Sequence, residues 1–256
     1  MLDVPVLFTE VDTAYLWRRW ALAVDEMHLA DNKESAIQAG RWYRALMAGY
    51  AMRDNNPFYN KIWILGTISA LAEMDSKTSL TPADRSSVTM ALWFSHFSYD
   101  SSVDLKQNRL RAAKTFMEFM STNAPNTTKP TENAFRARVM RALTGKETVL
   151  YANEADYTYR IFLDCTLAYM ALKPSQYRSW IARLRKQQEV VPEALWIAQR
   201  LKKLKEAKEL PVLYRTATAR TLFEDQARKN IATEIEDLEM DLKILEHTTK
   251  TGGLIG

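Results

Sequence analysis

The sequence predicts an all-α protein, and three observations point to that fold class. Most segments of the 256-residue chain place apolar residues three or four positions apart, which puts them on one side of a helix. Only 7 Gly and 8 Pro are present, too few for the many turns of a sheet-rich fold. Several segments begin with residues that cap helices. We therefore expect a single-domain helical bundle over residues 1–247 with a long carboxy-terminal helix, followed by a flexible tail at 248–256.

Five helices are predicted in the amino-terminal half. The first follows Asp12, an expected N-cap, and spaces Leu16, Trp20 and Val24 four residues apart. Another begins at Thr81, where the sequence TPAD offers a cap, a proline at the first helical position and an acid two residues later. The other three are expected in the segments ESAIQAGRWYRALMAGYAM, DNNPFYNKIWILGTISALAEM and DLKQNRLRAAKTFMEFM.

The last of these segments is amphipathic, and a loop follows it. Its apolar side is predicted to consist of Leu110, Ala113, Phe116, Met117 and Met120. The stretch STNAPNTTKPTEN (residues 121–133) is rich in turn-forming residues, so it is expected to be a surface loop inside the domain.

Helical patterns continue through the carboxy-terminal half. They are expected at Glu132–Leu143, Ala155–Leu172, Pro174–Gln188, Pro192–Lys205 and Thr218–Glu246. The last helix carries a seam with steps of 4, 3, 4 and 3 residues, formed by Ile231, Ile235, Leu238, Leu242 and Leu245. We expect the first half of this seam to pack on the protein's own core. The part beyond Leu238 is a candidate surface for a protein partner or for a second copy of the chain.

Composition excludes several classes of protein. The single cysteine, Cys165, excludes an intramolecular disulfide, and no apolar run is long enough to span a bilayer. The first residues carry acids rather than the basic segment of a secretory signal, so a cytoplasmic location is expected. The net charge is +4. The basic stretches at 178–188 and 199–209 have acids between or beside them, which favours solvated helix surfaces over a nucleic-acid site.

Motifs of common catalytic centres are also missing. The sequence has no glycine-rich phosphate loop, no GxSxG and no Cys/His pattern for zinc. Of the three histidines, His28 and His247 are expected on the surface. His96 follows the apolar ALWF on a helix, where a histidine is usually a hydrogen-bonded core residue.

Three separated segments resemble the HD superfamily of predicted metal-dependent phosphohydrolases. RIFLDCTLAYMA (160–171) is similar to the family's F-L-D-A-D-L-x-x-L-G, and ALWFSHFSYD (91–100) resembles its A-x-W-F-H-D-x-x-Y-D helix. Residues 210–238 resemble the closing I-Y-x-T and E-x-x-A-R-x-N-L-x-x-E-L motifs. The matching residues there are Tyr214, Thr216, Glu224, Ala227, Arg228, Asn230 and Glu234. The resemblance covers residues 42–238 and implies an HD-type helical bundle.

The resemblance also implies a divalent metal that activates water for attack on phosphorus. The chain departs from the family at the positions of the metal ligands. Asn60 and Ile64 stand where the histidines of a Y-H-x-x-x-H element belong, and Ser95 and His96 replace the His-Asp pair of the signature.

Two further ligand positions differ as well. Arg109 occupies the place of an acid, and Thr166 replaces the second aspartate, while Asp164 is kept. One imidazole and one carboxylate beside an arginine are a poor ligand set for a hard divalent cation. We therefore expect no metal and no cofactor.

The main hypothesis is a non-catalytic HD-type domain that acts by binding. Its partner would be a protein held by the carboxy-terminal helix, or a nucleotide or other phosphorylated small molecule; nucleic acid and membrane are not expected. A ligand pocket would be formed by Tyr59, Asn60, Ser95, His96, Tyr99, Arg109 and Asp164.

The alternative is a phosphohydrolase that acts on nucleotides or other phosphoesters with an altered or weak metal site. If the protein is active, His96 would be a general base and Asp164 would orient it. A third interpretation is that these two side chains hydrogen-bond each other within the core.

Overall fold

The computed structural model describes residues 8–51, 57–124, 130–145 and 157–252 of the chain. Within them the fold is all-α, with 80% helix and no strand, which confirms the predicted fold class. The elements are α1 (Glu10–Glu26), α2 (Lys33–Gly49), α3 (Lys61–Thr78), α4 (Pro82–Ser95), α5 (Leu105–Asn123), α6 (Pro130–Thr144), α7 (Tyr157–Leu167), the 3₁₀ helix η2 (Ala168–Ala171), α8 (Pro174–Gln187), α9 (Glu193–Lys208) and α10 (Ala217–Gly252).

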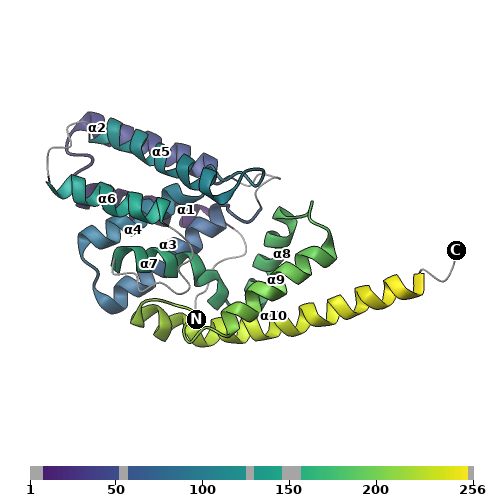
Figure 1. Ribbon diagram of the computed structural model, residues 1–256. Helices are drawn as coiled ribbons and strands as arrows, with labels where there is room; N and C mark the ends of the chain where they lie inside the picture. The colour runs from purple at the N-terminus through teal and green to yellow at the C-terminus, as the bar shows by residue number, and fades with distance from the viewer. Residues whose placement is uncertain (1–7, 52–56, 125–129, 146–156, 253–256) are drawn as a thin grey trace.

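Helix α4 lies at the centre of the bundle (Figure 1). Every residue from Ser86 to Phe94 is buried, and α1, α3, α5, α6 and α7 all contact this helix. A helix surrounded in this way has to be apolar on nearly every face, as the segment VTMALWF is. Its carboxy-terminal end, where Ser95 and His96 stand, is therefore held from several directions.

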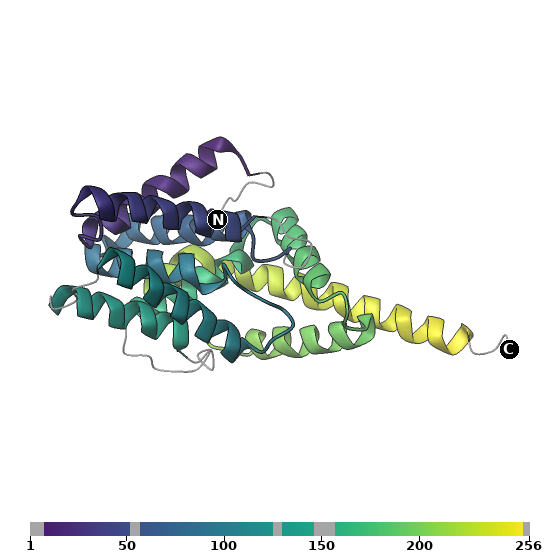
Figure 2. The same ribbon diagram turned by 90° about the horizontal axis from the view of Figure 1, so that it is seen from above.

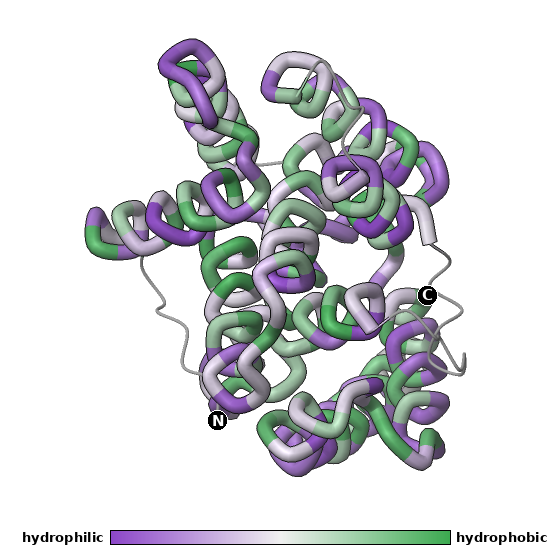
Figure 3. The backbone as a smooth tube through the Cα atoms, turned by 90° about the vertical axis from the view of Figure 1, so that its left-hand side faces the viewer, coloured by the Kyte–Doolittle hydropathy of each residue, from purple (hydrophilic) through white to green (hydrophobic). Residues whose placement is uncertain are grey.

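Aromatic rings fill the core between α1, α4 and α5. The Trp20 ring contacts Trp93 at a centroid distance of 5.8 Å and Phe119 at 5.5 Å, both edge to face. Leu16, Trp20 and Val24 are buried as their spacing predicts. Figure 3 shows hydrophobic and hydrophilic residues alternating along individual helices, as expected when each helix turns one side to the core.

Local signals set most helix ends. Thr81 caps α4 as predicted, since its side chain accepts a hydrogen bond from the Asp84 backbone N–H. The start of α1 differs from the prediction. Thr9 is the N-cap, and Asp12 is the third helical residue, whose carboxylate accepts a hydrogen bond from the Thr9 backbone N–H at 2.8 Å. The two residues form a reciprocal capping box, which places the N-cap three residues before the predicted one.

Three other predictions need correction. Leu110 does not lie on the buried side of α5 and is 56% exposed, because the buried stripe is centred on Phe116 and Phe119. The helix expected over Ala155–Leu172 ends as the 3₁₀ helix η2 instead of continuing as an α-helix, and its first two residues lie outside the described part of the chain. The loop predicted at 121–133 is shorter at both ends, and its residues 125–129 lie outside the described part of the chain.

Helices α8, α9 and α10 extend from one end of the bundle (Figures 1 and 2). In both views the last turns of α10 project beyond α8 and α9. The first half of the predicted seam packs on the protein itself, with Ile231, Ile235 and Leu238 buried. Leu242 and Leu245, predicted as part of a partner surface, are half-buried and pack against the same core. Residues 238–252 are called the arm below. The backbone of 248–252, expected in a flexible tail, continues α10, since extending an existing helix costs far less than starting one.

A buried ionic cluster fixes α10 at the point where it leaves the bundle. The Arg200 guanidinium of α9 binds both carboxylate oxygens of Glu234 at 2.8 and 2.9 Å, and the Tyr177 hydroxyl of α8 donates to the same carboxylate. All three side chains are buried. Because removing one partner would leave a charge uncompensated, this cluster holds the three helices in one arrangement.

Candidate functional site

The signature segment ends α4 and turns its polar residues toward each other. Ser95 is the last helical residue, and its hydroxyl lies 2.9 Å from Nδ1 of His96 and 3.0 Å from the Leu92 carbonyl oxygen. The His96 backbone N–H points to the hydroxyl of the buried Tyr50 at 3.4 Å. The predicted Ser95-His96 pair therefore forms a local contact at the end of the helix.

Aromatic rings enclose His96. Tyr59 stacks on the imidazole with centroids 4.0 Å apart and planes inclined by 13°. Trp63 meets the imidazole edge-on at 4.7 Å, and Tyr99 packs on Tyr59 at 4.6 Å. We call Tyr59, Trp63, His96 and Tyr99 the His96 cluster. Three of its four members were predicted as site residues; Trp63 was not, although it follows Tyr59 by four residues in a segment predicted to be helical.

Electrostatics keep the imidazole neutral. Burial, followed by the positive charge of Arg109, lowers the pKa of His96 to about 3. Arg109 lies half-buried on α5, so the structure brings it within electrostatic range of the cluster, as the sequence hypothesis required. At neutral pH the site combines an uncharged histidine with a nearby cation.

Asn60 serves as a helix cap. Its side-chain oxygen accepts hydrogen bonds from the backbone N–H groups of Ile62 and Trp63 at 2.8 and 3.3 Å, and its amide nitrogen donates to the Pro57 carbonyl oxygen at 2.7 Å. The side chain is buried, and its oxygen binds backbone N–H groups in the first turn of α3. Asn60 thus follows Tyr59 of the His96 cluster in the sequence, but its side-chain amide serves to cap α3.

Asp164 also has a structural role. Its carboxylate accepts hydrogen bonds from the backbone N–H groups of Arg215 and Thr216 and from the Thr216 hydroxyl, each at 2.8 Å. Burial raises the pKa of Asp164, and these hydrogen bonds oppose the rise. In the described residues no hydrogen bond joins Asp164 to His96. The interpretation that pairs these two side chains is wrong, because the carboxylate instead holds the segment that leads into α10.

The donor set does not fit the metal that the resemblance implies. Asn60 and Asp164 have their oxygens engaged with backbone groups, and the Thr166 hydroxyl donates to the Leu163 carbonyl oxygen at 2.8 Å. No group of three His, Cys, Asp or Glu side chains placed to hold a metal ion is found in the described part of the chain. His96 alone remains as a nitrogen donor, and a single imidazole is too little for a divalent cation.

A cleft beside the His96 cluster is aromatic and uncharged. It has an empty volume of about 220 Å³ including open solvent and is lined by Trp63, Gly66, Thr67, Thr166, Tyr169, Leu172 and Trp180. The Thr67 hydroxyl donates to the Ile64 carbonyl oxygen at 3.1 Å, and the Thr166 hydroxyl is used as described above. Since no lining residue carries a charge, this cleft is poorly suited to a phosphate group.

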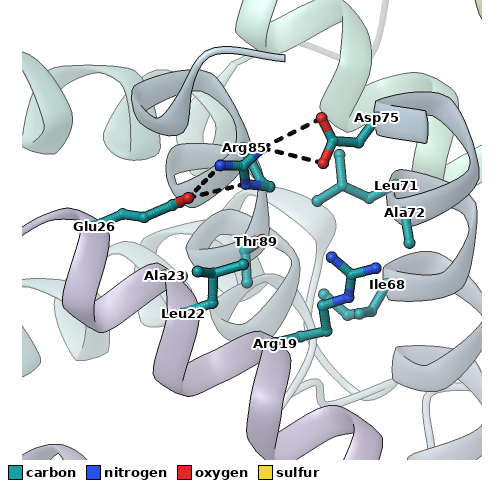
Figure 4. Close-up of a pocket in the computed structure, with 10 residues that line it drawn as sticks. All are labelled: Arg19, Leu22, Ala23, Glu26, Ile68, Leu71, Ala72, Asp75, Arg85 and Thr89. Atoms are coloured by element: carbon teal, nitrogen blue, oxygen red, sulfur yellow. Dashed lines mark hydrogen bonds and ion pairs between the residues drawn. The ribbon is translucent and has the colours of Figure 1, made fainter. Parts of the chain in front are cut away.

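A second cleft lies between α1, α3 and α4. Figure 4 shows Arg85 reaching between Glu26 and Asp75, with Arg19 and apolar side chains around the opening. The Arg85 guanidinium donates to Glu26 at 3.1 Å and to both oxygens of Asp75 at 3.1 and 3.3 Å. The sequence carries no local signal of this cluster, since its members are separated by up to 59 positions. The two acids compensate Arg85, so the cluster ties three helices together.

The residues of the closing motifs all make contacts that maintain the fold. Glu224 accepts hydrogen bonds from the Leu213 and Tyr214 backbone N–H groups, and Arg228 donates to Glu224 and to the Leu210 carbonyl oxygen. Asn230 donates to the carbonyl oxygens of Met170 and Leu172, both at 2.8 Å. The residues that carry the resemblance are thus those that join η2, the segment before α10, and α10 itself.

Neither a protein-family model nor a curated protein matches this chain. The HD-type assignment consequently rests on the motifs quoted above. Among the described residues no helix has the length and apolar character required to cross a bilayer.

Proposed function

We propose that this chain is a non-catalytic HD-type helical domain that acts by binding a protein partner through its arm. The observation that carries this proposal is the exposure of Met240 and Ile244, four residues apart on the projecting end of α10, at 63% and 57%. Large apolar side chains repeated at helical spacing on a projecting helix are typical of a surface that another protein covers.

The state of the former metal positions supports the absence of catalysis. Asn60 caps a helix, Asp164 binds backbone groups, and Tyr59 stacks on His96, so the polar atoms of a hydrolytic centre are committed elsewhere. A general base works best when its pKa lies near the working pH, and a pKa of about 3 makes His96 a weak base.

Binding of a phosphorylated ligand is a second candidate function. One observation favours it: the charge of Arg109 acts at the His96 cluster, where the rings of Tyr59 and Tyr99 offer stacking surfaces. The cleft next to the cluster carries no charge that would bind a phosphate, so phosphate-ligand binding ranks second. Addition of nucleoside phosphates would raise the melting temperature of the wild type and not that of Arg109→Ala if this candidate holds.

The first experiment is elemental analysis of the purified protein, with melting temperatures measured in manganese, in iron and in EDTA. We expect near-zero metal and a melting temperature that EDTA does not change. Stoichiometric metal would overturn the non-catalytic proposal and restore the phosphohydrolase alternative.

The binding proposal is tested with a double variant of the arm. Met240→Glu/Ile244→Glu should retain the wild-type melting temperature and lose the partner that the wild-type chain captures. Leu110→Glu is a matched control, because Leu110 is 56% exposed on α5, far from the arm in sequence. If the wild type, the double variant and Leu110→Glu capture the partner equally well, the proposal is wrong.

A further inference from the structure

Two neighbouring helices hold the excess basic charge of the chain. Helices α5 and α6 carry seven Lys and Arg residues and two acids, a net charge of +5, whereas the whole chain has a net charge of +4. The rest of the chain is thus close to neutral. Figures 1 and 2 show α5 and α6 side by side, while α10 projects from the opposite end of the bundle.

The exposed side of α5 presents a leucine between two lysines. Lys106, Leu110 and Lys114 follow one another at steps of four residues, which places them along one side of the helix, and all three are exposed. We call these three residues the basic stripe. From Leu105 to Met117 the helix contains no acid, in contrast to the basic stretches of α8 and α9, which have acids between or beside them.

The two lysines keep their charge uncompensated. Within the described ranges, neither the Lys106 nor the Lys114 ammonium group lies within ion-pair distance of a carboxylate, and this includes Glu118, one turn after Lys114. Lys205 of α9 differs, since its ammonium group lies 2.6 Å from a carboxylate oxygen of Glu239. The charge of the basic stripe therefore remains available to a partner from outside the chain.

Helix α6 does not offset this charge. It packs beside α5, with the Phe116 and Phe135 rings 6.1 Å apart, and it adds three arginines. Its only acid, Glu132, is buried. An anionic partner that approaches the basic stripe thus meets no exposed carboxylate on α6.

The leucine of the basic stripe distinguishes between kinds of anionic partner. Leu110 is 56% exposed, and a nucleic-acid backbone has no apolar group to cover it. The rings of α5 and α6, Phe116, Phe119 and Phe135, are all buried, so none is available to stack on a base. Among the described residues of these two helices, only Leu105 and Leu110 are large exposed apolar side chains, too few for insertion into a membrane surface. An acidic protein segment with an apolar residue between its acids matches both the lysines and the leucine.

From these observations we infer that the basic stripe is a second docking surface, which binds an acidic amphipathic helix of another protein. Such a helix carries a large apolar residue with an acid four positions before it and another four positions after it. Its apolar side chain meets Leu110, and its carboxylates meet Lys106 and Lys114. This surface is separate from the arm, so the inference goes beyond the proposed function and does not depend on it.

A synthetic peptide tests the recognition. An alanine-based peptide of about 16 residues, long enough to form a helix, carries Glu, Leu and Glu at steps of four. It is titrated into the isotopically labelled full-length chain while the amide chemical shifts are followed by NMR. We expect saturable shifts confined to α5 and α6, which are lost when Gln replaces both Glu residues or Ser replaces the Leu. Absence of shifts, or equal shifts with the Gln peptide, would overturn the inference.

Charge reversal locates the site. Lys106→Glu/Lys114→Glu should weaken peptide binding by roughly tenfold or more, because two attractions become repulsions. Lys202→Glu/Lys203→Glu makes the same change at two exposed lysines of α9 and should bind the peptide as the wild type does. Melting temperatures verify that both variants are folded. Equal losses in the two variants would show a general attraction between charges and would contradict a site on α5.

Two other probes test the kind of partner. A single-stranded DNA oligonucleotide and vesicles of phosphatidylserine and phosphatidylcholine are titrated under the same conditions. If either one binds the basic stripe more tightly than the peptide, the inferred partner is wrong.

The two surfaces also serve as controls for each other. Leu110→Glu should lose the peptide and retain the partner of the arm, whereas Met240→Glu/Ile244→Glu should bind the peptide as the wild type does. Failure at one surface is therefore distinguishable from failure at the other. Loss of the peptide in the arm variant would contradict a separate site on α5.

Discussion

The start of α10 and the end of α4 use their polar residues in different ways. Around α10, Asp164, Glu224 and Glu234 keep their carboxylates and bind backbone N–H groups or an arginine. At the end of α4, an imidazole is held between aromatic rings and stays neutral. The carboxylates around α10 stabilise the fold, since the loss of any one of them would leave a buried partner unsatisfied.

Replacing Glu234 should have the largest effect on stability. Glu234→Ala leaves the Arg200 guanidinium buried without its carboxylate, which we expect to cost about 3–5 kcal/mol of unfolding free energy in urea titrations. The exposed pair of Lys205 and Glu239 offers a control, and Glu239→Gln should leave stability unchanged. If Glu234→Ala and Glu239→Gln lower the free energy of unfolding equally, the Glu234 carboxylate is no more important to the fold than a surface carboxylate.

Asp164→Asn should cost less, about 1–3 kcal/mol, because the amide retains the shape but presents donors to some of the N–H groups that the carboxylate accepts from. Chemical denaturation measures the loss. A neutral result would mean that Asp164 is not a structural residue and would reopen its role in a site.

Gly49 tests how closely α2 approaches the end of α4. A Cβ at this position would lie 2.6 Å from the Phe97 ring and 3.1 Å from its carbonyl oxygen, so Gly49→Ala should destabilise the protein by about 1–3 kcal/mol. Gly40→Ala in the same helix meets nothing closer than 3.9 Å and should be neutral or stabilising by up to about 1 kcal/mol. Thermal melts of both variants would show opposite signs; a shared sign contradicts the packing.

The last effect is a pH dependence of stability that arises from His96. Its folded pKa of about 3 lies below the unfolded value near 6.5, so the unfolded state binds more protons between these values. Stability is full above pH 6.5 and falls as pH drops, by at most about 1.4 kcal/mol per unit.

Urea titrations at pH 7, 6 and 5 measure this slope. His96→Phe should flatten it, whereas His28→Asn at an exposed position should not, because the His28 side chain is 75% exposed. An unchanged slope in His96→Phe would contradict the burial of a neutral imidazole.

Much of the fold was predictable from sequence, and the site much less so. The spacing of Leu16, Trp20 and Val24 and the cap at Thr81 are local signals, and the structure confirms them. The partners of Asp164 lie more than 50 residues away, so no local pattern indicates that its carboxylate is occupied. The same holds for Glu26 and Arg85, which meet only after folding.

The site residues divide along the same line. Tyr59, His96 and Tyr99 were predicted and do lie together, and Arg109 acts electrostatically on His96. Asn60 and Asp164 were predicted as ligand-binding and instead bind backbone groups, because a buried carboxylate or amide satisfies the nearest N–H donors first.

The length of α10 turns its buried root into the pivot of a lever. From Glu234 to His247 the helix rises about 20 Å, so a tilt of about 10° at the root would displace the tip by roughly 3 Å. A small change in how Tyr177 and Arg200 hold Glu234 would thus be magnified at the far end. The ionic cluster sets the aim of the arm as well as the stability of the fold.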